Sequence, residues 1–231
     1  MEERKFVNVR KEEHRIKEFV KRTFGKGKIS SVKIEYAPVG EKIIVSTHKP
    51  GLVIGKRGEK IAQLTEVLKR RFKMENPHID IAEITKPDFD AQLVADEIAL
   101  ALERFGPVRF KAVAYKMLTR IKNAGALGAE LRISGKLPSD RARSWRFAFG
   151  YLKKTGDSSK VVDKGESVAH TKKGVVGIKV LVLSPDVKVH DRIDVDDELI
   201  SKIKENAAFE VVEKPEKEKK IKKSKSKKEK K

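Results

Sequence analysis

The chain has 231 residues, 39% of them hydrophobic, which is enough for a folded protein of one or two domains. It carries 54 Lys and Arg residues against 34 Asp and Glu residues, a formal net charge of +20, and it has no cysteine. The lack of cysteine excludes a disulfide framework, a zinc finger and a thiol nucleophile, and it fits a reducing compartment. The N-terminus is too charged for a signal peptide, and the apolar run 174–183 is too short to span a membrane.

The positive charge is distributed unevenly along the chain. Residues 213–231 hold 11 Lys and 4 Glu, a net of +7, so +13 remains for the rest. Residues 104–154 hold 13 basic residues and two acids, a net of +11, whereas residues 88–103 hold five acids and no base. Such concentrated positive charge is typical of proteins with a phosphate-rich partner. We therefore expect a nucleic acid as the ligand, rather than a soluble protein that is merely basic.

Apolar spacing in the first third of the chain predicts a small domain of helices and strands. Gly25 ends the first helix, the turn Pro38–Gly40 joins two strands into a hairpin, and Pro87 ends the last strand. In chain order we expect a helix over 12–24, strands over 31–36 and 42–47, a short helix, a glycine loop, a helix over 58–74 and a strand over 79–84. Together these elements predict an α+β domain over residues 1–86, with an N-terminal extension.

The following residues predict a second α+β domain over 87–185. Gly106 and Pro107 separate two helices, because proline cannot continue a helix. The segment 175–178 is apolar on both faces, so we expect its strand in the centre of a mainly antiparallel four-stranded sheet. The predicted elements are helices over 89–105 and 108–123 and strands over 129–134, 145–151, 167–171 and 175–183.

Two further segments follow these domains. Residues 186–212 form an acidic extension, in which Asp191–Glu198 indicates a solvated acidic stretch rather than a cation site. Residues 213–231 are nearly all Lys, Glu and Ser, so they cannot bury enough apolar surface to fold alone and we expect them to be disordered. Their lysines could still bind RNA loosely by counterion release, and a nuclear-import signal over 222–228 is a weaker alternative.

The segment GLVIGKRGEK, Gly51–Lys60, places two cations between glycines and has three interpretations. A P-loop needs four residues before its Gly-Lys pair and Ser or Thr after it, but here three residues intervene and Arg57 follows. A dinucleotide-binding loop needs a preceding parallel strand, and a predicted hairpin precedes this loop. The remaining interpretation is the Gly-x-x-Gly loop of a KH domain, which clamps a nucleic-acid backbone between a short helix and a longer one.

The residue types of this loop suit contact with a sugar-phosphate chain. Gly55 and Gly58 lack a Cβ atom, so the chain can lie against their backbone, and the free N–H groups at the start of the next helix favour phosphate. Lys56 and Arg57 add positive charge, and Val53–Ile54 offers apolar contact to bases. A plain turn between two helices is the simpler alternative. The RNA contacts that we expect here are Gly55, Lys56, Arg57, Gly58 and Lys60.

The order of elements matches the type II arrangement of KH domains, and longer motifs extend the similarity. They are KPGLVIGKRG at 49–58, AEITKP at 82–87, LVAD at 93–96, ISGKL at 133–137 and GVVGIKV at 174–180. In this order they resemble the universal small-subunit ribosomal protein three family in its archaeal form. The resemblance covers residues 4–183 and therefore includes both predicted domains.

This resemblance implies a structural protein of the small-subunit head and not an enzyme. Members of the family bind small-subunit ribosomal RNA and neighbouring ribosomal proteins of the head, and they line the channel through which mRNA enters. We therefore expect these three partners, no membrane contact, no cofactor, and a cytoplasmic location in the ribosome. A KH-domain regulatory protein outside the ribosome is the alternative, although the motifs of the second domain argue against it.

The family associates two basic residues at the start of the helix after the KH domain with mRNA contact and unwinding. Aligned on ISGKL, the first position falls on Lys111 and the second on the neutral Ala112. Arg109, Lys116 and Arg120 are close in sequence and could compensate, while a solvated basic face is the simpler alternative. At about 100° per residue, Lys111 points away from the other three cations. We expect Lys111 to face the channel, because it alone matches the family's basic position.

An arginine-rich loop after Pro138 is a further candidate, because the guanidinium fork suits phosphate. Its simpler alternative is surface solubility. The aromatic stripe over 145–151 could stack on bases, but strand alternation already explains it and favours a place in the core. The RNA contacts that we expect from this region are Lys136, Arg141, Arg143 and Arg146.

We predict no catalytic residue and no metal ligand. The five histidines show no ligand spacing. Some GTPases end in a type II KH domain, but this chain has no nucleotide-binding motif. A nuclease would need clustered acids near the RNA-binding face, and the acids here lie in 88–103 and after residue 186.

Overall fold

The computed structural model describes residues 2–37, 40–72, 74, 76–187, 189, 200, 201 and 203. The predicted acidic extension is described only in part, and the predicted Lys-rich tail lies outside these residues. The helices and strands named below belong to one compact unit, Met1–Lys188.

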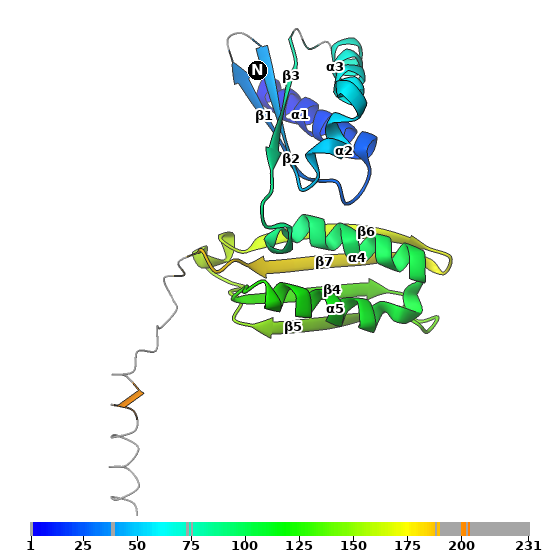
Figure 1. The fold of residues 1–231 in the computed structure, drawn as a ribbon, viewed down its shortest axis with the longest axis vertical. Coiled ribbons are helices and arrows are strands. Elements are labelled where there is room, and N and C mark those ends of the chain that lie inside the picture. The colour runs from blue at the N-terminus through cyan, green and yellow to red at the C-terminus, as the bar shows by residue number, and fades with distance from the viewer. Residues whose placement is uncertain are drawn as a thin grey trace, which may run out of the picture. The chain divides into compact units, whose positions relative to one another are not determined.

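A three-stranded sheet and three helices form the N-terminal part of this unit (Figure 1). The strand order is β1-β2-β3, with β1 and β2 antiparallel and β2 and β3 parallel. The elements are α1 (Glu2–Phe24), β1 (Ile29–Ala37), β2 (Gly40–Thr47), α2 (Pro50–Ile54), α3 (Glu59–Phe72) and β3 (His78–Glu83). The predicted order of helices and strands is therefore confirmed.

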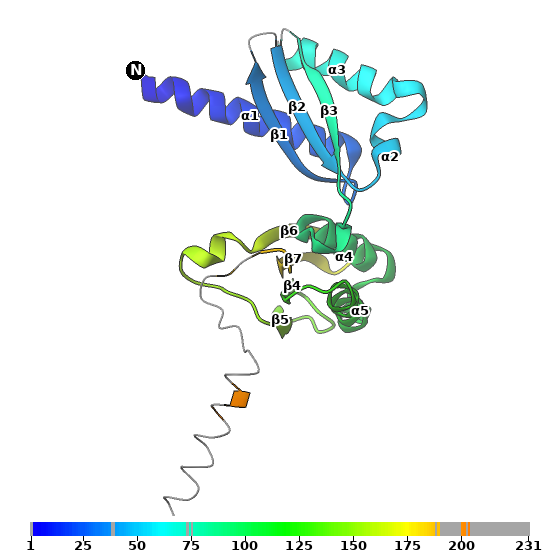
Figure 2. The same cartoon turned by 60° about the vertical axis from the view of Figure 1, so that its left-hand side comes forward.

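The core of this part lies between α1, α3 and one face of the sheet. Val20 of α1, Leu68 of α3 and Ile43 of β2 are completely buried in one apolar cluster. The helix α1 is longer than predicted and extends past the sheet in Figure 2. The apolar period that marks the core begins at Ile16, whereas the earlier turns carry exposed residues such as Phe6, which is 73% exposed.

A four-stranded sheet and two longer helices form the second part. The order is β5-β4-β7-β6 and every neighbouring pair is antiparallel, so β7 is central as predicted. The Asp90 side chain accepts hydrogen bonds from the N–H groups of Gln92 and Leu93 and so caps the first of these helices. The elements are α4 (Ala91–Phe105), α5 (Phe110–Asn123), β4 (Gly128–Gly135), β5 (Arg143–Gly150), β6 (Asp163–Thr171) and β7 (Gly174–Leu183).

The second core lies between this sheet and the helices α4 and α5. Phe110 is almost fully buried, with its ring centroid 5.5 Å from that of Trp145 and 6.3 Å from that of Phe147. Phe147 is buried, and Trp145 and Phe149 pack against the same cluster, so the prediction of core is confirmed for these three aromatics. It is wrong for Tyr151, which follows the strand and is exposed.

Polar contacts connect the two parts close to the end of α1. The Lys26 ammonium donates a hydrogen bond to Glu103 Oε1 at 2.8 Å, and the Gly27 N–H donates to Asp96 Oδ2 at 2.9 Å. The two apolar cores share no residue. The domain boundary predicted between residues 86 and 87 falls between these cores and stays a prediction.

Candidate nucleic-acid interface

The glycine loop links α2 to α3 through one 3-10 turn, Lys56–Gly58. Gly55 has φ 75° and ψ −177°, a backbone conformation that is essentially confined to glycine. Gly58 has φ 78°, and Arg57 between them has φ 52°, which is rare for a residue with a side chain. The Gly-x-x-Gly spacing is therefore required by the shape of the loop itself, and not only by space for a ligand.

The two glycines face different surroundings. A Cβ atom at Gly58 would meet nothing within 4 Å, so the surface outside this residue is open to a ligand. A Cβ atom at Gly55 would lie 2.8 Å from Lys60 Cγ. The Lys60 side chain therefore packs against the loop, and its ammonium donates a long hydrogen bond of 3.4 Å to Leu52 O.

The cations at the tip of the loop are available to an anion. Lys56 and Arg57 are exposed, and neither forms an ion pair with any residue in the described ranges. Glu59, the carboxylate that opens α3, accepts a hydrogen bond from Gln63 at 3.2 Å. The N-terminus of α3 and two unpaired cations thus form a site that favours phosphate.

The apolar contact expected from Val53–Ile54 is wrong for Val53. Val53 is completely buried in the core, whereas Ile54 and Leu52 are exposed. Of the residues Leu52, Val53 and Ile54 in the short helix α2, only one points into the core. Closeness to the glycines in sequence does not show which of the three it is. Leu52 and Ile54 are therefore the apolar side chains that can reach a base.

The cations of α5 differ from one another in their surroundings. The Lys111 ammonium lies 4.7 Å from the centroid of the Trp145 ring, so a cation–π contact holds it against β5. Arg109 and Lys116 are exposed and form no ion pair with the described residues. The structure therefore places Lys111 against β5, and the expectation that it faces the mRNA channel stays a prediction.

Arg120 is already paired within the protein. Its Nε lies 2.7 Å from Asp88 Oδ1, and its Nη1 lies 2.9 Å from Glu97 Oε2. Partial burial alone would lower the pKa of the Arg120 guanidinium, but the two carboxylates raise it overall. Its charge is thus largely offset before any RNA arrives, and an RNA contact at Arg120 stays a prediction.

The arginines after Pro138 do not form one cluster. The connection between β4 and β5 is held by a hydrogen bond of 3.3 Å from the Lys173 ammonium to Pro138 O. Arg141 and Arg143 are exposed near its end, together with Lys136 at its start. These three residues remain candidate phosphate contacts that share one end of the sheet.

Arg146 lies further along β5 and has a partner in β4. Its Nε is 2.9 Å from Oε1 of Glu130, whose side chain is only 5% exposed, and the Lys154 ammonium contacts the other carboxylate oxygen. Burial raises the pKa of the Glu130 carboxyl, but hydrogen bonds from Lys154 and Arg146 outweigh it, so its pKa lies below its ordinary value. Arg146 therefore pairs with a buried carboxylate, while more than half of its own side chain stays exposed on the basic surface.

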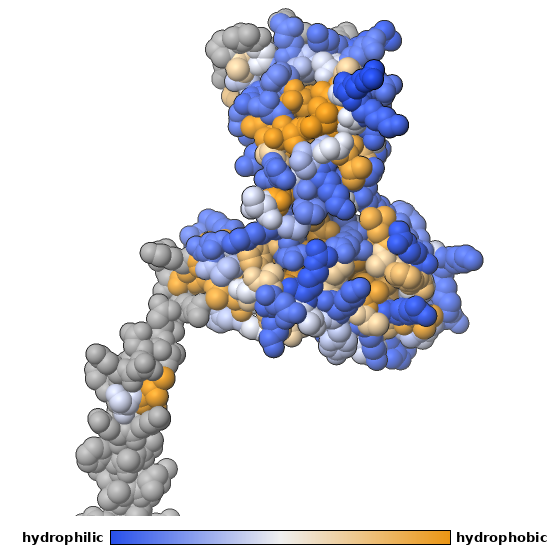
Figure 3. Space-filling model, viewed as in Figure 1, coloured by the Kyte–Doolittle hydropathy of each residue, from blue (hydrophilic) through white to orange (hydrophobic). Residues whose placement is uncertain are grey.

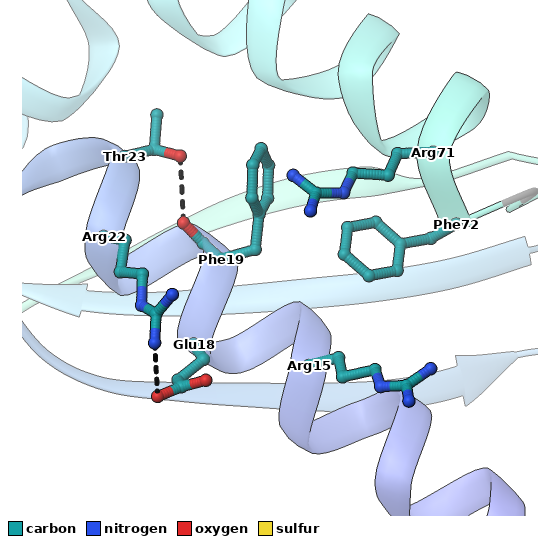
Figure 4. A pocket seen from close by; sticks show the side chains of 7 residues that line it. All are labelled: Arg15, Glu18, Phe19, Arg22, Thr23, Arg71 and Phe72. Carbon is teal, nitrogen blue, oxygen red and sulfur yellow. Dashed lines mark hydrogen bonds and ion pairs between the residues drawn. The ribbon is translucent and has the colours of Figure 1, made fainter.

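A hollow of about 700 Å³ between α1 and α3 was missed by sequence reasoning (Figure 4). The Arg71 guanidinium lies 5.1 Å from the ring centroid of Phe19 and 5.9 Å from that of Phe72. The spacing of Arg15, Phe19 and Arg22 along one face of α1 was the available signal. Its lining residues are Arg15, Glu18, Phe19, Arg22, Thr23, Arg71 and Phe72.

Hydrophilic residues cover much of the molecular face shown in Figure 3. No helix in the described part of the chain combines the length and the apolar character needed to cross a membrane. Within the same residues, no group of three or more His, Asp or Glu side chains is arranged to hold a metal ion.

Comparison with known families and proteins gives consistent matches. Residues 15–89 match the KH domain family, and residues 98–182 match the family described as "Ribosomal protein S3, C-terminal domain". Small ribosomal subunit protein uS3 of Methanocaldococcus jannaschii is 42% identical over 194 residues, which cover 84% of this chain and 92% of the relative. The chain belongs to the uS3 family of small-subunit ribosomal proteins. The uS3 protein of Archaeoglobus fulgidus is 41% identical over 203 residues, which cover 87% of each chain.

Membership of the uS3 family confirms the resemblance found in the sequence. A third uS3 protein, from Methanosphaera stadtmanae, is 35% identical over 92% of this chain and 84% of its own length. The chain is accordingly a ribosomal protein of the small subunit with a structural and not an enzymatic role. The individual RNA contacts expected from its residues stay predictions.

Proposed function

We propose that this uS3-family protein binds ribosomal RNA in the head of the small subunit and helps to form the channel through which mRNA enters. The observation that carries the proposal is the glycine loop, where Gly55 and Gly58 have positive φ angles and where Lys56 and Arg57 form no ion pair with a carboxylate among the described residues. We further propose that the protein contacts neighbouring ribosomal proteins of the head and that it is located in the cytoplasm as part of the ribosome. A regulatory role outside the ribosome is less favoured, because the family match extends through both domains.

The loop is suited to hold a phosphate by its backbone. The N–H groups at the start of a helix lack partners one turn earlier, and the positive end of the helix dipole lies at the same place. In α3 the N–H of Glu59 already donates to Lys56 O, so a phosphate would have to use the N–H groups that follow it. The open space outside Gly58 allows a sugar-phosphate chain to reach these groups. Lys56 and Arg57 then provide charge-assisted contacts to the same chain.

Two exposed cations, one in α5 and one in the turn directly before it, support the second element of the proposal. Arg109 and Lys116 have no carboxylate partner among the described residues, so they can contact the phosphates of a passing message. Such contacts carry no sequence preference, which suits a channel that must accept every mRNA. Lys111 contributes from a different side of the helix, where Trp145 limits its movement.

RNA binding by the loop can be tested with Arg57→Asn. Asparagine tolerates the positive φ of this position, so the variant removes the charge and keeps the turn. We expect weaker binding of a small-subunit ribosomal RNA fragment and a salt dependence of log affinity that is shallower by about one contact. Lys69→Gln, an exposed cation at the other end of α3, is the matched control. Equal affinity of Arg57→Asn and wild type, with the fold intact, would remove the loop from the proposal.

A further inference from the structure

The four-stranded sheet has one face that α4 and α5 do not cover. Strand alternation turns Ala129, Leu131 and Ile133 of β4 toward these helices, where they are buried, so Glu130 and Arg132 point to the opposite face. In Figure 2, α4 and α5 lie on one side of this sheet, and the connection from β5 to β6 lies on the other. This open face is a surface separate from the glycine loop and from the exposed side of α5.

The strand register places a row of charged residues across the open face. Arg146 of β5 lies directly opposite Arg132 of β4, and Arg132 lies directly opposite Lys179 of β7. Lys179 in turn lies opposite Glu166 of β6. Neighbouring strands are about 4.8 Å apart, so the Cα atoms of the three basic residues fall within about 10 Å of one another.

This row is unfavourable for the free protein, because like charges directly opposite each other on a sheet are destabilising. Within the described residues, only the first and the last of the three cations are paired with a carboxylate. Arg146 pairs with Glu130 at 2.9 Å, and Lys179 pairs with Glu166 at 2.8 Å. Arg132, in the middle, is exposed and forms no ion pair with any described residue. The centre of the face is left with an excess of positive charge.

A hollow of about 310 Å³ lies on the same face. The β5–β6 connection forms one wall of it, and β4, β6 and β7 form the floor. Its basic lining residues are Arg132, Lys153, Lys154, Lys164 and Lys179, and its acidic ones are Glu130 and Glu166. A surface that combines a concave shape with five cations and two paired carboxylates is complementary to an anion with several charges.

We propose that this open sheet face binds the phosphate backbone of RNA, with Arg132 at its centre, as a second RNA surface beside the glycine loop. The inference rests on the proposed role of the protein in a ribosomal RNA particle. Neighbouring phosphates along one strand can offset the three cations together, whereas a single small anion would offset one. The planar guanidinium groups of Arg132 and Arg146 match phosphate oxygens in geometry as well as in charge.

The test compares two substitutions with opposite expected effects in the full-length protein. Arg132→Gln removes the unpaired cation, and Glu166→Gln removes the carboxylate that partly neutralises the row. A fluorescein-labelled RNA hairpin of mixed sequence serves as the probe, and its affinity is measured by fluorescence anisotropy over a range of salt concentrations. Arg104→Gln, an exposed cation at the end of α4 on the helical side of the sheet, is the matched control.

We expect Arg132→Gln to bind the hairpin about fivefold more weakly, with a salt slope lower by about one, and Glu166→Gln to bind it more tightly. The control should bind like the wild type. Because Arg132→Gln removes a like-charge contact, its thermal midpoint should equal or exceed that of the wild type. A purely structural role of Arg132 would instead lower the midpoint and leave the affinity unchanged.

Three outcomes would overturn the proposal, and the first two are distinguishable from failure of the proposed function. Wild-type affinity of Arg132→Gln, with weakened Arg57→Asn, would reject the sheet face and leave the loop in place. If Arg132→Gln weakened the binding of polyglutamate and not that of the hairpin, the face would be a site for an acidic protein segment. If neither Arg57→Asn nor Arg132→Gln lost affinity, both the sheet face and the loop would be rejected as RNA contacts.

Discussion

The KH domain and the C-terminal domain of this protein contain candidate phosphate sites of different kinds. In the KH domain the candidate site is the loop between α2 and α3, whose backbone shape depends on the positive φ angles of Gly55 and Gly58. In the C-terminal domain the candidate sites are made of side chains, namely the exposed cations of α5 and the row of cations across the sheet. A backbone site is sensitive to changes of shape, whereas a side-chain surface is sensitive to changes of charge.

The contrast extends to stability. The loop is destabilised by unfavourable backbone angles in a few residues. The sheet is destabilised by electrostatic repulsion between the basic side chains of the row. Substitutions that relieve the backbone strain or the repulsion should stabilise the free protein and lower its affinity for RNA. The following four predictions test how far the two domains are separate, and they run from the largest expected effect to the smallest.

The largest effect is expected from Phe110→Ala in the C-terminal core. This ring is almost fully buried between Trp145 and Phe147, so its removal should cost about 3–5 kcal/mol of unfolding free energy. Trp145 is the only tryptophan of the chain, and its fluorescence reports the unfolding of this domain. Val108→Ala, at an exposed position next to the helix, is the control. The separation of the domains would be wrong if Phe110→Ala also abolished RNA binding by the glycine loop.

A smaller effect is expected from Gly55→Ala in the KH domain. The backbone conformation of Gly55 disfavours any side chain, and the new Cβ atom would lie 2.8 Å from Lys60 Cγ, so we expect a loss of about 1–3 kcal/mol. Gly51→Ala is the matched control, because a Cβ atom there meets nothing within 4 Å and φ is not positive. Chemical denaturation followed by circular dichroism measures both. Equal stability of the two variants would show that the loop is not strained.

The contact between the domains should contribute less. The Lys26 ammonium and the His170 N–H donate hydrogen bonds to Glu103, and they hold the pKa of that carboxyl below its ordinary value. This stabilisation is therefore complete above the ordinary glutamate pKa of about 4.3, and it is lost as pH falls from there through the lowered folded-state pKa. Glu103→Gln should remove this pH dependence at a cost of about 0.5–1 kcal/mol.

A double-mutant cycle of Lys26→Gln and Glu103→Gln isolates this contact. We expect a coupling free energy above zero at neutral pH that disappears in acid. Coupling that is unchanged across this pH range would mean that the Glu103 carboxylate does not carry the interaction.

An effect on stability no larger than that of Glu103→Gln is expected from Lys111→Gln. The cation–π contact with Trp145 contributes about 0.5–1 kcal/mol at an exposed site, and its loss should change the emission of the single tryptophan. If Lys111 faces the mRNA channel, ribosomes with this variant should also translate a hairpin-containing message more slowly relative to an unstructured one. Lys122→Gln, near the end of the same helix, is the control. An unchanged rate ratio would shift the channel role to Arg109 or Lys116.

The glycine loop could be found from sequence because all of its determinants are local. The residues that require the turn and the residues that carry the charge lie within GLVIGKRGEK, between elements with clear periodicity. The same locality explains why β7 was correctly expected in the centre of its sheet, since an apolar run shows burial on both faces. Val53 escaped prediction because a helix as short as α2 has too few residues to define an inward face.

The pairing of the arginines could not be found from sequence, because their partners lie far along the chain. Arg120 contacts Asp88 and Glu97, which come from a different segment, so a count of local charge gives no sign of the contact. The row on the open sheet face depends on strand register, which brings Arg132 opposite Arg146 and Lys179. A shift of one residue would turn these side chains to the other face, and the charge pattern alone does not exclude it.

The parallel pairing of β2 with β3 has a consequence for the order in which the protein assembles. The hairpin of β1 and β2 is local and can form within about 1–10 μs, but β3 joins only after the residues between Thr47 and His78 have closed into a crossover. The glycine loop is part of that crossover. A nascent chain that ends at Phe72 would therefore contain every residue of the loop, yet the loop would have no fixed shape to offer to RNA. We therefore expect the loop to take its final shape only once β3 has been synthesised and has joined β2.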